Sequence, residues 1–290
     1  MIALDDEWLD EHPLPAIDHD TDKNRRGRLL IAGGSQNVPG ALLLTGEAGY
    51  RAGAGKVQLA VPQATTSSIG VLMPEAAVFG MDINDKGELG PAPERLAKLI
   101  DRCDALVLGP GMGADSDARN LLEAVLAQKG TQVALLLDAA AIAVSPDFAD
   151  ELRAWSGPLV LTPHPGEMAS LMRCETDAVE DAMAQEAADR FGATVLLKGP
   201  HTLVASPGGG EVLQYEGPGP GMATGGSGDV LAGIIGGLLA RGADARTAAA
   251  WGVWAHGEAG RILASSVAPI GFLARELLPQ VPALLYRRSA

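Results

Sequence analysis

Strand-like and helix-like segments alternate along almost all of this 290-residue chain, and this alternation is the strongest constraint on its fold. The strand-like segments are short apolar runs that end in glycine or a charged residue, such as 28–34 (RLLIAGG) and 133–138 (VALLLD). Strands that are apolar throughout are buried on both faces, and repeated β-then-α units place them in a parallel sheet between helices. The sequence therefore predicts an α/β protein, a three-layer αβα sandwich with a mainly parallel central sheet.

The expected elements follow from this alternation. Strands are predicted to begin at residues 28, 56, 75, 105, 133, 159 and 195, and a polar hairpin is predicted at 201–205 and 211–215. Helices are predicted at 39–52, 94–101, 116–129, 177–191, 229–240, 245–263 and 272–285. Residues 1–22 are expected to form a polar N-terminal arm on the surface, and residues 23–290 are expected to form one domain.

The composition excludes several classes of protein. The formal net charge is −14, so the chain is not expected to bind nucleic acid. No apolar run reaches the ~18 residues that a membrane-spanning helix needs, and the acidic N-terminus does not resemble a secretory signal. A cytoplasmic protein is therefore expected. Cys103 and Cys174 have no metal-ligand spacing and are expected to be small core residues.

The densest motif is the glycine-rich stretch at 217–233, GPGPGMATGGSGDVLAG. The apolar run after Asp229 is long enough for a buried helix, so the preceding glycines form a loop that leads into a helix N-terminus. Free backbone N–H groups and the helix dipole make such a terminus an anion site. A carboxylate beside it suits a general base that takes a proton from a hydroxyl as phosphate arrives. The alternative is a structural turn in which Asp229 is only a helix N-terminal acid.

Polar residues follow several expected strands, at the end where ligands collect in parallel sheets. His164 lies between two prolines, and both ligand contact and a structural role are open for it. Lys198 either meets a phosphate or lies in solvent, and Asp138 either joins the site or caps the following helix. Residues with apolar helical spacing are expected in the core or in a subunit interface: Trp251, Trp254 and His256.

Nucleotide-binding motifs of other classes are absent or weak. The chain has no GxxxxGK(S/T) sequence, so it is not a P-loop enzyme. Residues 109–114 fit GxGxxA after a strand, which makes a Rossmann-type oxidoreductase a rival hypothesis. Pro110 is unusual in that motif, and Asp138 comes too late to be the acid that binds a ribose.

Five segments together resemble the ADP- or ATP-dependent NAD(P)H-hydrate dehydratase family, the carbohydrate-kinase-like domain of the NAD(P)HX repair system. They are Gly40 with Ala41, residues 109–113, LTPHPGEMASL at 161–171, LLKGPHT at 196–202 and ATGGSGDVLAGIIGGLLARG at 223–242. The resemblance covers nearly the whole chain from about Lys23 onward and implies a ribokinase-like fold. The glycine–aspartate motif alone is shared with ribokinase-like kinases, whereas its combination with TPHPGE and KGxxT is more specific to the dehydratases.

The resemblance also implies a reaction and a set of residues. NAD(P)HX is a hydrated nicotinamide, and phosphorylation of its C6 hydroxyl would turn a poor leaving group into a good one before phosphate is eliminated. Asp229 would be the catalytic base, ADP or ATP the phosphate donor, and Mg²⁺, with unknown protein ligands, would bridge the phosphates. The implied hydrate-binding residues are Ala41, Gly111, Gly113, His164 and Asp229. The implied nucleotide-binding residues are Lys198, Gly199, Pro200, His201, Thr202, Thr224, Gly225, Gly226 and Gly228.

The chain departs from the family in two ways. Members often carry Asp-Ala-Asp where this sequence has Asp138, Ala139 and Ala140, so any role of the second acid is in doubt here. The epimerase domain that is often fused upstream is also missing, which implies a separate epimerase partner. A homotetramer is the expected assembly by resemblance. Two further classes stay open: a ribokinase-fold kinase for a hydroxymethyl vitamin precursor, and a nucleotide-binding sensor without turnover.

Overall fold

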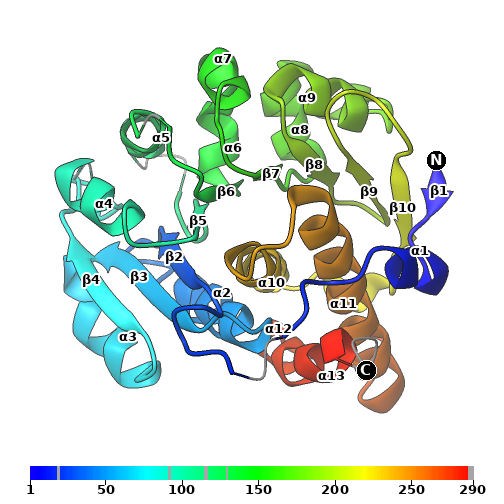
Figure 1. Cartoon of the computed structure of the whole chain (residues 1–290), viewed down its shortest axis with the longest axis horizontal. Coiled ribbons are helices and arrows are strands. Elements are labelled where there is room, and N and C mark those ends of the chain that lie inside the picture. The colour runs from blue at the N-terminus through cyan, green and yellow to red at the C-terminus, as the bar shows by residue number, and fades with distance from the viewer. Residues whose placement is uncertain (18–19, 91–92, 114–116, 129, 287–290) are drawn as a thin grey trace.

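The computed structural model describes residues 1–17, 20–90, 93–113, 117–128 and 130–286. Ten strands of this part form one sheet in the order β1-β10-β9-β8-β7-β6-β5-β2-β3-β4 (Figure 1). Their bounds are β1 Ile2–Ala3, β2 Arg28–Ala32, β3 Lys56–Pro62, β4 Ala77–Met81, β5 Ala105–Leu108, β6 Ala134–Leu137, β7 Leu159–Leu161, β8 Thr194–Leu197, β9 His201–Ala205 and β10 Leu213–Glu216. Neighbouring strands from β4 to β8 are parallel, and β9 runs antiparallel to β8 and β10. The predicted sheet and hairpin are confirmed.

Helices cover both faces of this sheet. Their bounds are α1 Asp6–Glu11, α2 Gly40–Arg51, α3 Thr66–Leu72, α4 Pro93–Ile100, α5 Ala118–Leu126, α6 Ala140–Val144, α7 Ala149–Arg153, α8 Pro165–Met172, α9 Met183–Phe191, α10 Ser227–Ala240, α11 Ala245–Ser266, α12 Ala274–Leu277 and α13 Val281–Tyr286. Within the described ranges, no helix is both long enough and apolar enough to cross a bilayer.

Several predicted helices differ from the observed ones. The helix predicted at 177–191 begins only at Met183, because a separate 3-10 turn occupies Thr176–Ala178. The helix predicted at 272–285 is divided by the 3-10 turn Leu278–Gln280, in which a proline removes a backbone donor. The helix predicted at 116–129 is observed as α5, and residues 116 and 129 lie outside the described part. The short helices α3, α6, α7 and α8 were not predicted.

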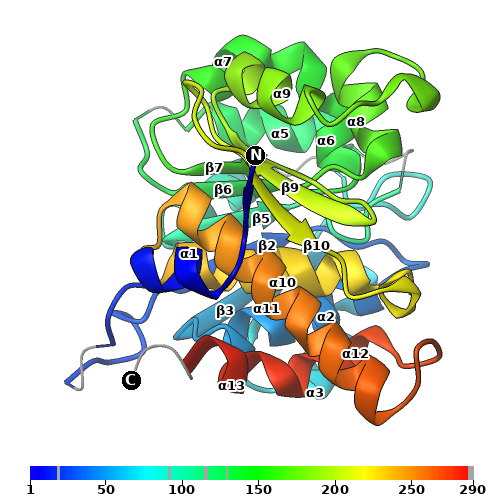
Figure 2. The ribbon, with the colours of Figure 1, turned by 90° about the vertical axis from the view of Figure 1, so that its right-hand side faces the viewer.

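The alternation of side chains along each strand divides the core in two. Leu29 and Ile31 of β2 pack in a cluster with α2, α10 and α11, whereas Leu30 and Ala32 pack in a second cluster with α5, α6 and α9. Figure 2 shows these two groups of helices above and below the sheet. This is the predicted three-layer αβα arrangement, and it explains why the strands are apolar throughout.

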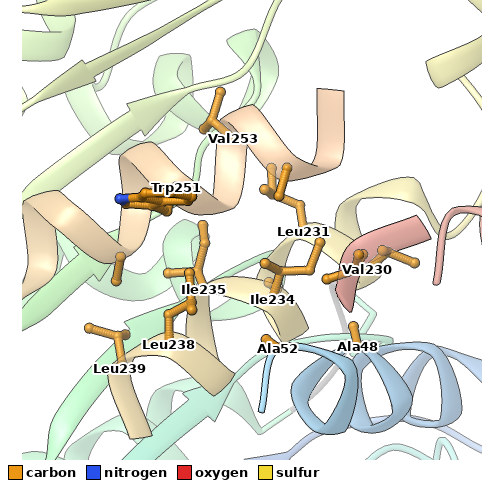
Figure 3. Close-up of a cluster of buried hydrophobic side chains, with 14 of the residues drawn as sticks. Ala48, Ala52, Val230, Leu231, Ile234, Ile235, Leu238, Leu239, Trp251 and Val253 are labelled. Atoms are coloured by element: carbon orange, nitrogen blue, oxygen red, sulfur yellow. The ribbon is translucent and has the colours of Figure 1, made fainter. Parts of the chain in front are cut away.

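Helix α10 lies in the middle of the first cluster, between α2 and α11 (Figure 3). Its glycines permit the close approach of α2. A Cβ on Gly233 would lie 2.2 Å from the carbonyl oxygen of Thr45, and one on Gly237 would lie 2.7 Å from that of Gly49. The two backbones therefore touch, and α2 fixes the position of the glycine loop that precedes α10.

The N-terminal segment packs against the sheet, which corrects the prediction of a polar surface arm. Ile2 pairs in parallel with Leu213 as the outermost strand, and α1 buries Trp8 and Leu9. The indole of Trp251 donates a hydrogen bond to the carbonyl oxygen of residue 12 at 2.8 Å. A two-residue strand and a six-residue helix carry too little pattern to be recognised in sequence. The boundary between residues 22 and 23 stays a prediction.

Candidate active site

The predicted glycine loop leads directly into helix α10. Gly226 is the N-cap residue with a φ of 90°, a conformation that side chains with a Cβ rarely adopt, and Ser227 is the first helical residue. Lys198 directly follows β8, and a Cβ on Gly228 would lie 3.8 Å from its Nζ atom. The backbone N–H groups at the start of α10 therefore lie at the carboxyl-end edge of the sheet, as an anion site requires.

Asp229 lies in the first turn of α10 and is half-buried. Burial, and to a smaller extent the nearby charge of Asp138, raise the pKa of its carboxyl group from 3.8 to about 7, against the opposing charge of the Lys198 ammonium group. A carboxylate with a pKa near neutrality is well matched to taking a proton from a hydroxyl.

Lys198 connects the acids of this site. Its Nζ atom lies 3.1 Å from Oδ1 of Asp138 and 3.6 Å from Oε2 of Glu167. Burial lowers the pKa of the ammonium group, but the two carboxylates outweigh burial, so the pKa is raised and the lysine stays charged. Asp138 also accepts a hydrogen bond of 2.7 Å from the hydroxyl of Thr162.

These contacts settle two alternatives left open by the sequence. The side chain of Lys198 is only 22% exposed, so a lysine in solvent is wrong. Asp138 does not cap the following helix, because the N-cap residue of α6 is Ala139 and the Asp138 carboxylate bonds to Thr162 and Lys198 instead. Ala140, where the family often has an acid, begins α6 itself.

His164 has a structural role that the sequence left open. It is the N-cap of α8, where its Nδ1 accepts a hydrogen bond of 3.2 Å from the backbone N–H of Glu167. The Glu167 carboxylate in turn accepts a bond of 2.9 Å from the backbone N–H of His164. This capping box holds the imidazole at the end of β7, where its ring is 56% exposed and remains accessible to a ligand.

A cavity of about 830 Å³ opens between the glycine loop, the β8–β9 turn and helix α11. Most of the predicted nucleotide-binding residues line it: Lys198, Gly199, Pro200, Thr202, Thr224 and Gly228. His164, which was predicted to contact the hydrate, lines the same cavity. His201, Gly225 and Gly226 are not among its wall residues, and the His201 ring pairs with Asp181 at 3.2 Å instead.

The remaining predicted hydrate-binding residues form a second group. A Cβ on Gly111, whose φ is 67°, would lie 2.7 Å from the Cβ of Ala41. The backbone N–H of Gly113 donates to Oε2 of Glu88 at 3.1 Å. Glu88 is only 8% exposed, and the sequence gave no indication of its contact with Gly113.

The sequence also missed His256 as a residue of the cavity wall. Its helical spacing predicts a place in the core or in a subunit interface, whereas the ring borders the cavity, with Nε2 3.0 Å from the hydroxyl of Ser227. A polar residue among the small and apolar residues of α11 was the only signal in the sequence, and it was too weak to decide between packing and a ligand site.

The layered sheet and the glycine loop before α10 define a protein of the ribokinase-like class. A solved ribokinase-like superfamily protein from Enterococcus faecalis matches 99% of this chain and 96% of its own length, with a TM-score of 0.83 and 29% identity. The family model for NAD(P)H-hydrate dehydratase matches residues 29–283, and the chain belongs to that family. This membership confirms the resemblance seen in the sequence and disfavours the Rossmann-type oxidoreductase.

Individual relatives agree with this membership. The ADP-dependent (S)-NAD(P)H-hydrate dehydratase of Xanthomonas campestris pv. campestris is 45% identical over 283 residues, which cover 96% of this chain and 94% of that protein. The ADP/ATP-dependent NAD(P)H-hydrate dehydratase of Bacillus subtilis, co-crystallised with ATP/Mg²⁺, has a TM-score of 0.81 and 28% identity, with 97% of this chain and 98% of that chain covered. The Bifunctional NAD(P)H-hydrate repair enzyme Nnr of Moorella thermoacetica is 36% identical over 94% of this chain, which spans only 52% of that protein.

Proposed function

We propose that this protein uses an adenine nucleotide to dehydrate the (6S) hydrate of NADH or NADPH and so restores the reduced dinucleotide. The observation that carries the proposal is Asp229, a half-buried carboxylate with a pKa of about 7 in the first turn of the helix that follows the glycine loop. Membership of the NAD(P)H-hydrate dehydratase family supplies the substrate class.

In the first step, Asp229 takes the proton of the C6 hydroxyl of the hydrate, and the hydroxyl oxygen attacks the terminal phosphoryl group of the nucleotide. The nucleotide leaves with one phosphate fewer. Backbone N–H groups at the start of α10 stabilise the negative charge on the transferred group, and Lys198 adds a positive charge beside them.

In the second step, the C6–O bond of the phosphate ester breaks, and inorganic phosphate leaves with the bonding electron pair. A proton is lost from the neighbouring ring carbon, and the ring double bond forms again. The balance is one hydrate and one nucleotide consumed, with one reduced dinucleotide, one shortened nucleotide, one phosphate and one proton released.

The site fits Mg²⁺ as an ion that enters with the nucleotide. Among the described residues, no three His, Cys, Asp or Glu side chains converge to hold a metal ion. Mg²⁺ usually keeps several waters and takes only one or two carboxylates in addition to phosphates. Asp138 and Glu167, which both contact Lys198, are the carboxylates that such an ion would use. Bound there, it would spread the charge of the phosphates.

The hydrate would lie against Ala41, Gly111, Gly113 and His164, with its reacting hydroxyl at Asp229, and the nucleotide would fill the cavity of about 830 Å³. The protein would act in the cytoplasm as a homotetramer, together with a separate epimerase that interconverts the two hydrate epimers. Light scattering would check the assembly.

The test is an assay with hydrated NADH, Mg²⁺ and either ADP or ATP. The proposal predicts an increase in absorbance at the NADH band and one inorganic phosphate for each NADH formed. Accumulation of a phosphorylated acceptor without NADH absorbance would indicate a kinase instead. Nucleotide binding without any product would indicate a sensor.

A further inference from the structure

Ser227 and His256 form a polar pair on the wall of the cavity. Ser227 is 7% exposed and begins α10, immediately before Gly228 and Asp229. Its hydroxyl lies 3.0 Å from Nε2 of His256, which comes from the neighbouring helix α11. Both residues line the cavity, together with apolar residues such as Leu231 and Val253.

The hydrogen bond between them can run in two directions, and the direction decides what the serine can do. If neutral His256 accepts from the Ser227 hydroxyl, the hydroxyl proton is already used. If Nε2 carries the proton and donates to the Ser227 oxygen, the hydroxyl proton is free to donate elsewhere. A phosphate oxygen at this helix terminus accepts hydrogen bonds only, so an anion selects the second arrangement.

The electrostatics of the pair agree with a neutral donor. Burial, together with the charge of Lys198, lowers the pKa of His256 from 6.5 to about 4, and a hydrogen bond to the backbone of Ser227 acts in the opposite direction. The imidazole is therefore uncharged near neutral pH, and its tautomer is set by its hydrogen bonds. Lys198 contributes a positive charge at this site, whereas the Ser227 hydroxyl contributes a hydrogen-bond donor with a fixed orientation.

We propose that His256 is a positioning residue that donates from Nε2 to the Ser227 oxygen and thereby aims the Ser227 hydroxyl at a phosphate of the nucleotide bound at the glycine loop. This inference rests on the proposed nucleotide site. It adds a side-chain donor to the backbone groups at the start of α10, at a residue whose own ring need not touch the phosphate.

The experiment compares Ser227→Ala, His256→Leu, the double variant and His256→Gln by calorimetric titration with ADP and by steady-state kinetics. A lost hydrogen bond to a charged group corresponds to roughly 10-fold or more in affinity. We expect His256→Leu and Ser227→Ala each to weaken ADP binding by about this factor, with the dinucleotide KM unchanged. The double variant should be no weaker than Ser227→Ala. The Gln variant, which can place an amide N–H near the Nε2 position, should recover most of the loss.

Nitrogen NMR of the histidine rings gives a readout that a packing role would not change. With ADP bound, the His256 signals, assigned by their absence in His256→Gln, should show the Nε2–H tautomer. Additive losses in the double variant, or an Nδ1–H tautomer in the ADP complex, would overturn the inference and leave the dehydratase function intact. Failure of the unsubstituted protein to bind ADP at all would instead remove the proposed nucleotide site, and this inference with it.

Discussion

The ammonium nitrogen of Lys198 lies 3.1 Å from Oδ1 of Asp138, and the same lysine lowers the pKa of Asp229. Asp138 acts on Asp229 in the opposite direction, because one carboxylate disfavours the ionisation of another. The lysine therefore favours the charged form of Asp229, in addition to its proposed contact with phosphate. The pKa of Asp229, the proposed catalytic base, therefore depends on a residue outside its own helix.

Replacement of Lys198 should change the pH dependence of turnover. In Lys198→Ala, the charge that lowers the pKa of Asp229 is lost, so the acidic limb of the kcat–pH profile should move to higher pH. The apparent constant for the nucleotide should also rise. Lys198→Arg keeps the charge and is the matched control. An unshifted acidic limb in the alanine variant would show that Asp229 is not the group that titrates.

Asp229→Asn should abolish turnover while nucleotide binding survives, because the base is lost and the glycine loop is kept. Base catalysis of this kind contributes on the order of 10²–10⁴ in rate. ADP titration and single-turnover kinetics would measure the two properties separately. If the Asn variant kept more than about a tenth of the rate, another group would be the base.

The same substitution should affect stability in a pH-dependent way. The pKa of Asp229 is raised from 3.8 to about 7 in the folded protein, so between these values the folded state holds a proton that the unfolded state has released. The free energy of unfolding therefore falls as pH rises through this window. Asp229→Asn removes this loss, and its melting temperature relative to the unsubstituted protein should be higher at about pH 8 than at about pH 4. An equal difference at both pH values would contradict the raised pKa.

Much of this site could be predicted because it depends on local sequence. The loop before α10 follows from closely spaced glycines and a long apolar run, and the strand ends follow from apolar segments that stop at Asp138 or Lys198. Which side chains pair across those ends could not be predicted. Asp138, Thr162 and Lys198 follow three neighbouring strands, and their contacts depend on strand order and on the direction of each side chain.

The features that the sequence did not predict were missed for similar physical reasons. A capping box usually begins with serine or threonine, so a histidine in that role at His164 gave no signal. His256 reaches Ser227 only because α10 and α11 pack side by side, a contact between residues that are far apart in the sequence. β1 was missed because two residues cannot show a period.

Two glycines at the start of α10, one in the preceding loop and one in the first turn, should respond differently to substitution by alanine. At Gly226, φ is 90° and a Cβ would lie 2.5 Å from Cδ1 of Leu44, so Gly226→Ala should lose about 1–2 kcal/mol of stability from backbone strain alone. At Gly228, in the first turn of α10, the nearest atom to a Cβ is Nζ of Lys198 at 3.8 Å. Gly228→Ala should fold as stably as the unsubstituted protein but bind ADP more weakly, since Gly228 lines the cavity. Chemical denaturation and ADP titration would measure both, and unchanged ADP binding in Gly228→Ala would remove the loop from the nucleotide site.

Substitution of His164 can separate its structural role from ligand binding. His164→Ala removes the N-cap of α8 and should cost about 0.5–2 kcal/mol of stability. His164→Asn keeps a side chain that caps helices well, so it should retain most of that stability while losing the imidazole. We expect the Asn variant to bind the dinucleotide hydrate more weakly and ADP almost normally, whereas Lys198→Ala should show the reverse. Calorimetric titration of both variants with both ligands checks this assignment.

His164 lines the same cavity as Lys198, so the titration can also give the opposite result. If His164→Asn weakened ADP binding alone, the imidazole would belong to the nucleotide site. The hydrate would then lie only against the group around Gly111 and Gly113.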